Sequence, residues 1–191
     1  MYAVIFILFN ALTIFMHPAY EDEETAGLSV GDYAPDFKAK DQFGKTISLN
    51  ESLKSGKVIL TFYRGAWCRY CMAQFRNYQD SLSLINEKGG ILIAITPEHE
   101  DGVQKTTSVS KATFSILHDE KLKIMLSYNV ISKEKYNEFI KGYEETGVDN
   151  QHKYLPVPAT YIINQDQKIV FKYFDPNYRV RVPIDKLLEN L

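Results

Sequence analysis

Both cysteines of the chain lie in one short stretch, Tyr63–Cys71 (YRGAWCRYC), directly behind the only tryptophan, Trp67. Cys68 and Cys71 are three positions apart, and residues at this spacing on a helix share one face, so their sulfurs can bridge with little motion. Such a pair can alternate between a dithiol and a disulfide. The residue types and their spacing therefore favour a redox-active dithiol.

Two other uses of this pair are weaker. A zinc site needs two further ligands, but the chain has no second cysteine pair, and its four histidines are scattered at positions 17, 99, 118 and 152. An inert structural disulfide is the other alternative. A bridge that closes so few residues restrains the unfolded chain only weakly, so it would be a poor staple.

The surroundings of the pair predict a reactive thiol. The apolar run Val58 to Tyr63 (VILTFY) is typical of a buried strand, and Cys68 to Lys88 has no Pro or Gly and near-helical apolar spacing. A cysteine where a helix begins feels the positive end of the helix dipole, which favours the thiolate. Arg64 and Arg69 add positive charge nearby.

The remaining elements alternate between strands and helices, which predicts βαβ units with a late antiparallel hairpin, and hence an α/β fold. We expect strands over residues 91–96, 114–117, 159–164 and 169–174, with a turn at 165–168 between the last two. We expect helices over residues 98–110, 120–128, 133–145 and 184–191, and Gly89-Gly90 as the end of the helix that starts at Cys68.

Composition indicates one globular domain. The chain has 191 residues, of which 45% are hydrophobic and 24% charged, and its net charge is -2. This balance, without a cluster of Lys or Arg, argues against a nucleic-acid partner. Nothing in the chain predicts a cofactor or a metal.

The N-terminus predicts a targeting segment. Residues Tyr2 to Met16 are almost all apolar, and an acidic run from Glu21 to Glu24 follows. We expect residues 1–27 to be a signal peptide or membrane anchor with a short acidic linker, and residues 28–191 to be the folded domain. The protein would then be extracytoplasmic, where disulfides persist. The alternative is a buried core element, which would leave the protein in the cytoplasm.

A resemblance to a known family rests on five segments of the chain: VGDYAPDF (30–37), FGKTISLN (43–50), VILTFYRGAWCRYC (58–71), ILIAITPE (91–98) and VPATYIINQDQKIVFKYFDPNYRVR (157–181). The chain resembles the thioredoxin-fold superfamily, and within it the peroxiredoxin-like branch of the alkyl hydroperoxide reductase/thiol-specific antioxidant (AhpC/TSA) family. The resemblance implies a single thioredoxin-like domain, a central mixed sheet with helices on both faces. It also implies a peroxide substrate, and thioredoxin or another dithiol as reductant.

The chain departs from the peroxiredoxin loop Pro-x-x-x-Thr-x-x-Cys. Arg64 stands at the Pro position, Cys68 at the Thr position and Cys71 at the peroxidatic Cys, while the family's second active-site Arg falls on Pro158. The replacements are thioredoxin-like. On that template Cys68 is the attacking thiol and Pro158 the cis-proline that faces it. The two templates therefore disagree on which cysteine attacks, and we favour Cys68.

Reduction of a peroxide also needs donors for the developing charge on the leaving oxygen. Arg64, Arg69 and one of Arg179 or Arg181 are the candidates, and each could instead be a surface or salt-bridging residue. Trp67 is expected to form a hydrophobic docking platform beside the dithiol, with plain packing as the alternative.

Three functions remain open. The first is a thioredoxin-dependent, peroxiredoxin-like peroxidase, and the second is a protein-disulfide reductase in an extracytoplasmic compartment. The third is a non-enzymatic redox sensor or binding module. Its partner surface could lie in the insertion 131–155, where Tyr136, Phe139 and Tyr143 have helical spacing. An amphipathic helix packed on the sheet is the simpler interpretation of that spacing.

Overall fold

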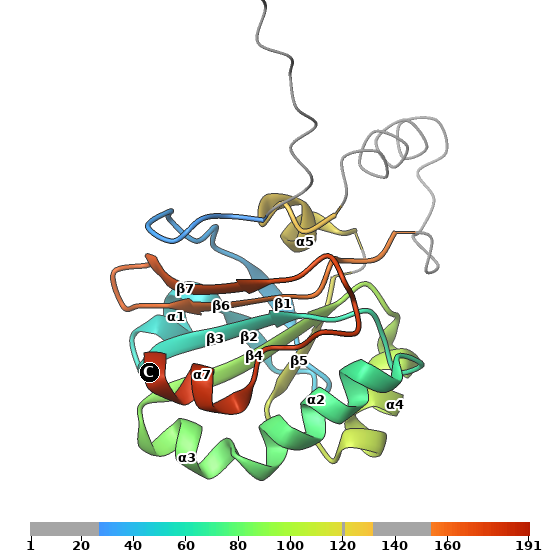
Figure 1. The fold of residues 1–191 in the computed structure, drawn as a ribbon. Helices are drawn as coiled ribbons and strands as arrows, with labels where there is room; N and C mark the ends of the chain where they lie inside the picture. The colour runs from blue at the N-terminus through green and yellow to red at the C-terminus, as the bar shows by residue number, and fades with distance from the viewer. Residues whose placement is uncertain (1–26, 120, 132–153) are drawn as a thin grey trace, which may run out of the picture.

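The centre of the molecule is a five-stranded mixed sheet in the order β5-β4-β3-β6-β7 (Figure 1). The structure is a computed structural model that describes residues 27–119, 121–131 and 154–191. Strands β3, β4 and β5 run parallel to one another, and β6 and β7 add an antiparallel pair on the other side of β3. The strands are β3 Lys57–Phe62, β4 Gly90–Thr96, β5 Ser115–His118, β6 Ala159–Ile163 and β7 Ile169–Phe174. The predicted α/β fold with a mixed sheet is confirmed.

Strand β3 is the middle strand of the sheet and is covered on both faces. From Val58 to Phe62 every residue is buried, as expected for a strand whose apolar run has no polar alternation. Its carboxyl end leads directly into the stretch that holds the cysteines. The carboxyl ends of β3 and β4 and the start of β6 lie at the same edge of the sheet, because β6 runs antiparallel to β3.

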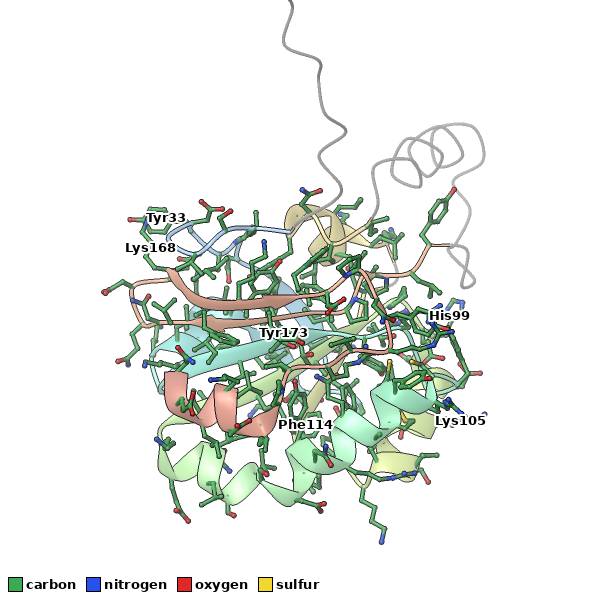
Figure 2. The ribbon with its side chains drawn as sticks, in the orientation of Figure 1. Tyr33, His99, Lys105, Phe114, Lys168 and Tyr173 are labelled. Carbon is green, nitrogen blue, oxygen red and sulfur yellow. The ribbon has the colours of Figure 1, made fainter. Side chains whose placement is uncertain are left out.

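Helices cover both faces of the sheet, as predicted. Figure 1 shows α2, α3 and α7 along one face and α5 on the other. The first face carries α2 (Arg69–Asp80), α3 (Leu82–Glu87), α4 (Glu100–Ser110) and α7 (Ile184–Asn190), and the second α1 (Leu49–Leu53) and α5 (Lys123–Ser127). The core of the first face is aromatic: Phe114, labelled in Figure 2, packs edge-on against Phe75 of α2 with ring centroids 5.4 Å apart. That packing fixes α2, and hence its first turn, on the sheet.

Three short elements precede the sheet and were not predicted. A hairpin of β1 (Lys38–Lys40) and β2 (Thr46–Ser48) leads into α1. Strands of three residues are too short to show a period in the sequence, and the resemblance alone pointed to this segment.

Two predicted helices differ in extent. The helix expected from Cys68 to Lys88 is divided at Ser81, where φ is -103° and ψ is 6°, so α2 ends at Asp80 and α3 begins at Leu82. The helix expected over 120–128 starts only at Lys123. Leu122 has a left-handed backbone, and the buried Asp119 carboxylate accepts the Met125 N–H at 2.8 Å. The side chain of Asp119 therefore caps a shorter helix than the apolar pattern indicated.

Two predictions fall outside the described residues. The apolar N-terminal segment lies in residues 1–26, and the helix over 133–145 with Tyr136, Phe139 and Tyr143 lies in residues 132–153. Among the helices that the structure describes, none is long and apolar enough to cross a membrane.

Candidate active site

The two cysteines lie at the start of α2, at the carboxyl edge of the sheet. Cys68 is the N-cap residue of α2, and its carbonyl accepts the Met72 N–H at 3.0 Å, which begins the helix. Cys71 lies in the first turn. Both are free thiols, and only 3% of Cys68 and 0% of Cys71 is exposed. The predicted placement of the pair at a strand-to-helix junction is confirmed.

Arg181 brings a cation to both sulfurs. Its Nη2 lies 3.3 Å from Sγ of Cys71 and 3.8 Å from Sγ of Cys68. Its Nη1 donates to the carbonyls of Val180, at 2.8 Å, and Tyr178, which orients the guanidinium from within its own segment. The Nε of Arg181 is buried and has no hydrogen-bond partner among the described residues. The Nε–H group of Arg181 is therefore available to donate a hydrogen bond at the site.

These surroundings separate the pKa values of the two thiols. The pKa of Cys68 is lowered from 9.0 to about 5, first by hydrogen bonds from Cys71 and then by the charges of Arg181 and Arg64, although burial acts in the opposite direction. The pKa of Cys71 is raised, first because Cys71 donates that hydrogen bond and second because it is buried. Arg181 lies closer to Cys71 and alone would favour either thiolate. We assign the thiolate to Cys68 because it caps the helix N-terminus, where the dipole favours negative charge.

A buried acid that the sequence analysis missed supports the loop before Cys68. The Glu98 carboxylate, 3% exposed, accepts the Ala66 N–H at 2.7 Å. Gly65 has a φ of +146°, and a Cβ there would lie 2.5 Å from Cδ of Glu98 and 2.6 Å from Nε1 of Trp67. Only glycine allows this close approach. The sequence feature that could have indicated this role is the position of Glu98 at the end of ILIAITPE, just after a buried strand.

Arg64 and Trp67 lie beside the dithiol and stack on each other. The Arg64 guanidinium carbon is 4.8 Å from the Trp67 ring centroid and 4.3 Å from that of Tyr178. The side chain of Arg64 therefore lies on rings, and its charge acts on Cys68 through space. Tyr178 was not singled out in the sequence analysis, although it belongs to the motif DPNYRVR that supplies Arg181.

Arg69 and Arg179 point to other partners. Arg69 donates to the Tyr70 hydroxyl at 2.8 Å, and the guanidinium carbon of Arg179 lies 4.7 Å from the Tyr178 ring centroid. Of the four arginines considered as donors to a leaving oxygen, Arg181 is the one that the structure places within hydrogen-bond distance of the sulfurs.

Pro158 differs from the expectation. It is buried directly before β6, and Ala159 pairs with Phe62 at the end of β3, so Pro158 lies at the same edge of the sheet as the cysteines. However, the described residues contain no cis peptide bond. The expected cis-proline is therefore wrong, and Pro158 is a trans proline at a strand entrance, where it removes no ladder hydrogen bond.

A metal ion has no evident place here. Within the ranges that the structure describes, no group of three or more His, Cys, Asp or Glu side chains could hold one. The chemistry available to the site is that of two thiols, one of them ionised, with a guanidinium against both sulfurs.

Sequence comparison finds a matching family model and related proteins. The model of the AhpC/TSA family matches residues 30–172. A Helicobacter pylori (strain J99) protein named as a peroxiredoxin, bcp, is 28% identical over 164 residues, which cover 86% of this chain and 98% of the relative. The thiol-disulfide oxidoreductase ResA of Bacillus cereus is 26% identical over 167 residues, 87% of this chain and 82% of ResA.

Among solved structures, the fold is similar to that of the peroxidoxin BcpB from Mycobacterium tuberculosis. The TM-score is 0.67 at 20% sequence identity, over 85% of this chain and 96% of BcpB. This likeness supports the thioredoxin-like fold predicted from the sequence.

Proposed function

On the premise that the chain belongs to the AhpC/TSA family and is a thiol-based oxidoreductase, we propose that it reduces peroxides. The reaction runs through a Cys68/Cys71 dithiol-disulfide cycle, and a thioredoxin-type dithiol supplies the electrons. One observation carries the proposal: the Arg181 guanidinium lies within 3.8 Å of both sulfurs at the N-terminus of α2.

The first step is attack by the Cys68 thiolate on one peroxide oxygen. An S–O bond forms, the O–O bond breaks, and the released oxygen takes a proton to leave as water or an alcohol. Cys68 becomes a sulfenic acid. The donors of Arg181 can hold the charge that grows on the leaving oxygen, because that oxygen departs within reach of the attacked sulfur.

The second step joins the two cysteines. The Cys71 sulfur attacks the Cys68 sulfenic acid, an S–S bond forms, and the hydroxyl leaves as water with the proton of Cys71. Cys71 suits this role because its raised pKa keeps it protonated until Cys68 has reacted. A partner dithiol then reduces the bridge by thiol-disulfide exchange and is itself oxidised to a disulfide.

A second candidate is a protein-disulfide reductase. Two observations favour it: Cys68 stands where the peroxiredoxin loop has Thr, and Pro158 stands where it has the second Arg. The likeness to ResA points the same way. In this version the Cys68 thiolate attacks a partner disulfide, one partner thiol leaves, and Cys71 then releases the other.

Trp67 provides a direct test, because it is the only Trp and lies next to Cys68. We would follow its fluorescence in stopped flow after mixing the reduced protein with H2O2, and separately with a disulfide-bonded protein. Cys68→Ser and Cys71→Ser are measured beside the wild type. If the peroxide proposal holds, the reduced protein reacts far faster than a free thiol, and Cys68→Ser abolishes the first phase.

Two outcomes would contradict this. A peroxide rate no faster than that of a free thiol, together with rapid reduction of the protein disulfide, would establish the reductase instead. Loss of the first phase in Cys71→Ser, with Cys68→Ser still reactive, would reverse the assigned order of the cysteines.

We also propose that the protein acts outside the cytoplasm, with the apolar run at residues 2–16 as its targeting segment. A full-length chain carrying a C-terminal tag should fractionate with exported or membrane material. Deletion of residues 2–16 should return it to the cytoplasm, and an unchanged distribution would refute this assignment.

A further inference from the structure

A partly exposed group of arginines and aromatic rings lies beside the dithiol. Trp67 is 49% exposed, and Arg64 lies between its ring and that of Tyr178. Arg179 also lies against the Tyr178 ring. We call the set Arg64, Trp67, Arg69, Tyr70, Tyr178 and Arg179 the arginine–aromatic surface.

The second half of this surface is built around Tyr70. Its ring meets that of Tyr178 edge-on at 6.0 Å, and the guanidinium carbon of Arg69 lies 4.8 Å from the Tyr70 ring centroid. The Tyr70 hydroxyl is within reach of two cations: the hydrogen bond from Arg69, and then that from Arg179, lower its pKa. Positive charge is therefore concentrated here.

The charges of this surface are not neutralised locally. No ion pair joins Arg64, Arg69 or Arg179 to a carboxylate of the described residues. Stacking uses the flat face of a guanidinium and leaves its in-plane N–H groups free to donate, two at a time, to a carboxylate. The net charge of the whole chain is -2, so this local excess of positive charge does not follow from the overall composition.

The surface also adjoins the reactive sulfur. Trp67 and Arg69 are the neighbours of Cys68 in sequence, and Tyr178 and Arg179 belong to the segment that carries Arg181. A shallow cavity of about 230 Å³ lies beside it, with Tyr70, Arg179 and Arg181 in its lining. That volume suits a side chain rather than a drug-sized ligand. A protein that brings a sulfur to Cys68 must therefore cover these rings and arginines.

We infer that the arginine–aromatic surface binds an acidic segment, with Asp or Glu beside its cysteine, of the protein that exchanges disulfides with Cys68. This inference rests on the proposed function, in which that protein is the dithiol that reduces the Cys68–Cys71 disulfide. The carboxylates pair with Arg69 and Arg179, and apolar parts of the segment pack on Trp67 and the exposed part of Tyr178.

The test uses peptides that cannot react. Two peptides of equal length carry Ser in place of the partner cysteine, one flanked by Asp and Glu and the other by Asn and Gln. Binding is followed by the fluorescence of Trp67 at low salt. We expect the acidic peptide to bind about tenfold more tightly, the scale of two exposed ion pairs, and the difference to shrink at 0.5 M salt.

Matched variants locate the effect. In Arg69→Gln/Arg179→Gln the two peptides should bind within about twofold of each other, because the main ion-pair partners are gone. The control Arg76→Gln/Lys105→Gln removes the same charge from exposed sites on α2 and α4 and should keep the preference. Arg64 stays unchanged in these variants, because its charge acts on Cys68.

Equal binding of the two peptides would overturn the inference, as would the same loss of preference in the control pair, since net charge and not this surface would then be the cause. Because neither peptide contains a thiol, the binding result does not depend on turnover. Failure of the proposed function would be seen separately, in the reaction of the reduced protein with peroxide and with a protein disulfide.

Discussion

The guanidinium of Arg181 donates to the sulfur of Cys71 at 3.3 Å, although 110 residues separate them in the sequence. The C-terminal segment after β7 carries this cation back across the sheet to the first turn of α2. The two residues belong to different elements that meet only in the folded protein. The reactivity of the dithiol therefore depends on the complete fold.

Replacement of Arg181 should make Cys68 less acidic. Arg181→Gln removes a positive charge that lowers the pKa of Cys68, so the midpoint of the pH profile for alkylation by iodoacetamide should move upward from near 5. The size of the shift is expected to be smaller in Arg181→Lys, which keeps a charge but not the planar donor pair. Arg76→Gln, on the exposed side of α2, serves as the control, and an unmoved midpoint in Arg181→Gln would exclude this role.

The two cysteines should differ in reactivity in the reduced wild-type protein. Because Cys68 is ionised near neutral pH and Cys71 is not, a brief pulse of iodoacetamide at pH 7 should label Cys68 almost alone. Peptide mass spectrometry gives the ratio of labelled sites, with a chain unfolded in urea as the control in which both react alike. Comparable labelling of both sites in the folded protein would show that the thiolate is shared.

The stability of the reduced protein should rise with pH in a defined window. The pKa of Cys68 is about 5 when folded and 9.0 in its ordinary state. Between these values the unfolded chain binds a proton that the folded chain has released, so folding is favoured as the pH increases. Below pH 5 both states hold the proton and the gain is lost.

Urea unfolding under a phosphine reductant at pH 5, 7 and 8.5 measures this effect. The difference in unfolding free energy between wild type and Cys68→Ser should grow across that series, since the Ser variant lacks the titrating group. A constant difference would mean that Cys68 keeps an ordinary pKa in the folded state.

The close approach at Gly65 predicts a costly substitution. Gly65→Ala places a Cβ 2.5 Å from the Glu98 carboxyl carbon in a backbone of positive φ, so we expect a loss of about 1 to 3 kcal/mol in stability and slower attack by Cys68. Gly44→Ala is the matched control, because Gly44 also has positive φ but no atom within 4 Å. Thermal unfolding and the peroxide rate check both effects, and equal losses in the two variants would show that Glu98 gives way freely.

The predicted strands and helices are present in the structure where a long apolar run or a helical spacing indicated them. Strands β3, β4, β6 and β7 lie within a residue of their predicted bounds. For β3, β4 and β6 the reason is that a buried strand is apolar along almost its whole length. Elements fixed by one side chain or one dihedral angle were missed: the break at Ser81 and the late start of α5 beside Asp119 leave no period in the sequence. The trans bond at Pro158 likewise depends on packing that no local pattern reports.

The sequence by itself determined the chemistry of this protein. Cys68 and Cys71, three apart behind a strand and at the start of a helix, specify a dithiol whose geometry is local, since one helical turn sets the spacing of the two residues. The tertiary structure decided which of four arginines reaches the sulfurs, and that Glu98 supports the loop. It also gathered Trp67, Tyr70 and Tyr178 into one surface. These contacts join residues that are close only after the sheet has assembled, and no spacing along the chain encodes them.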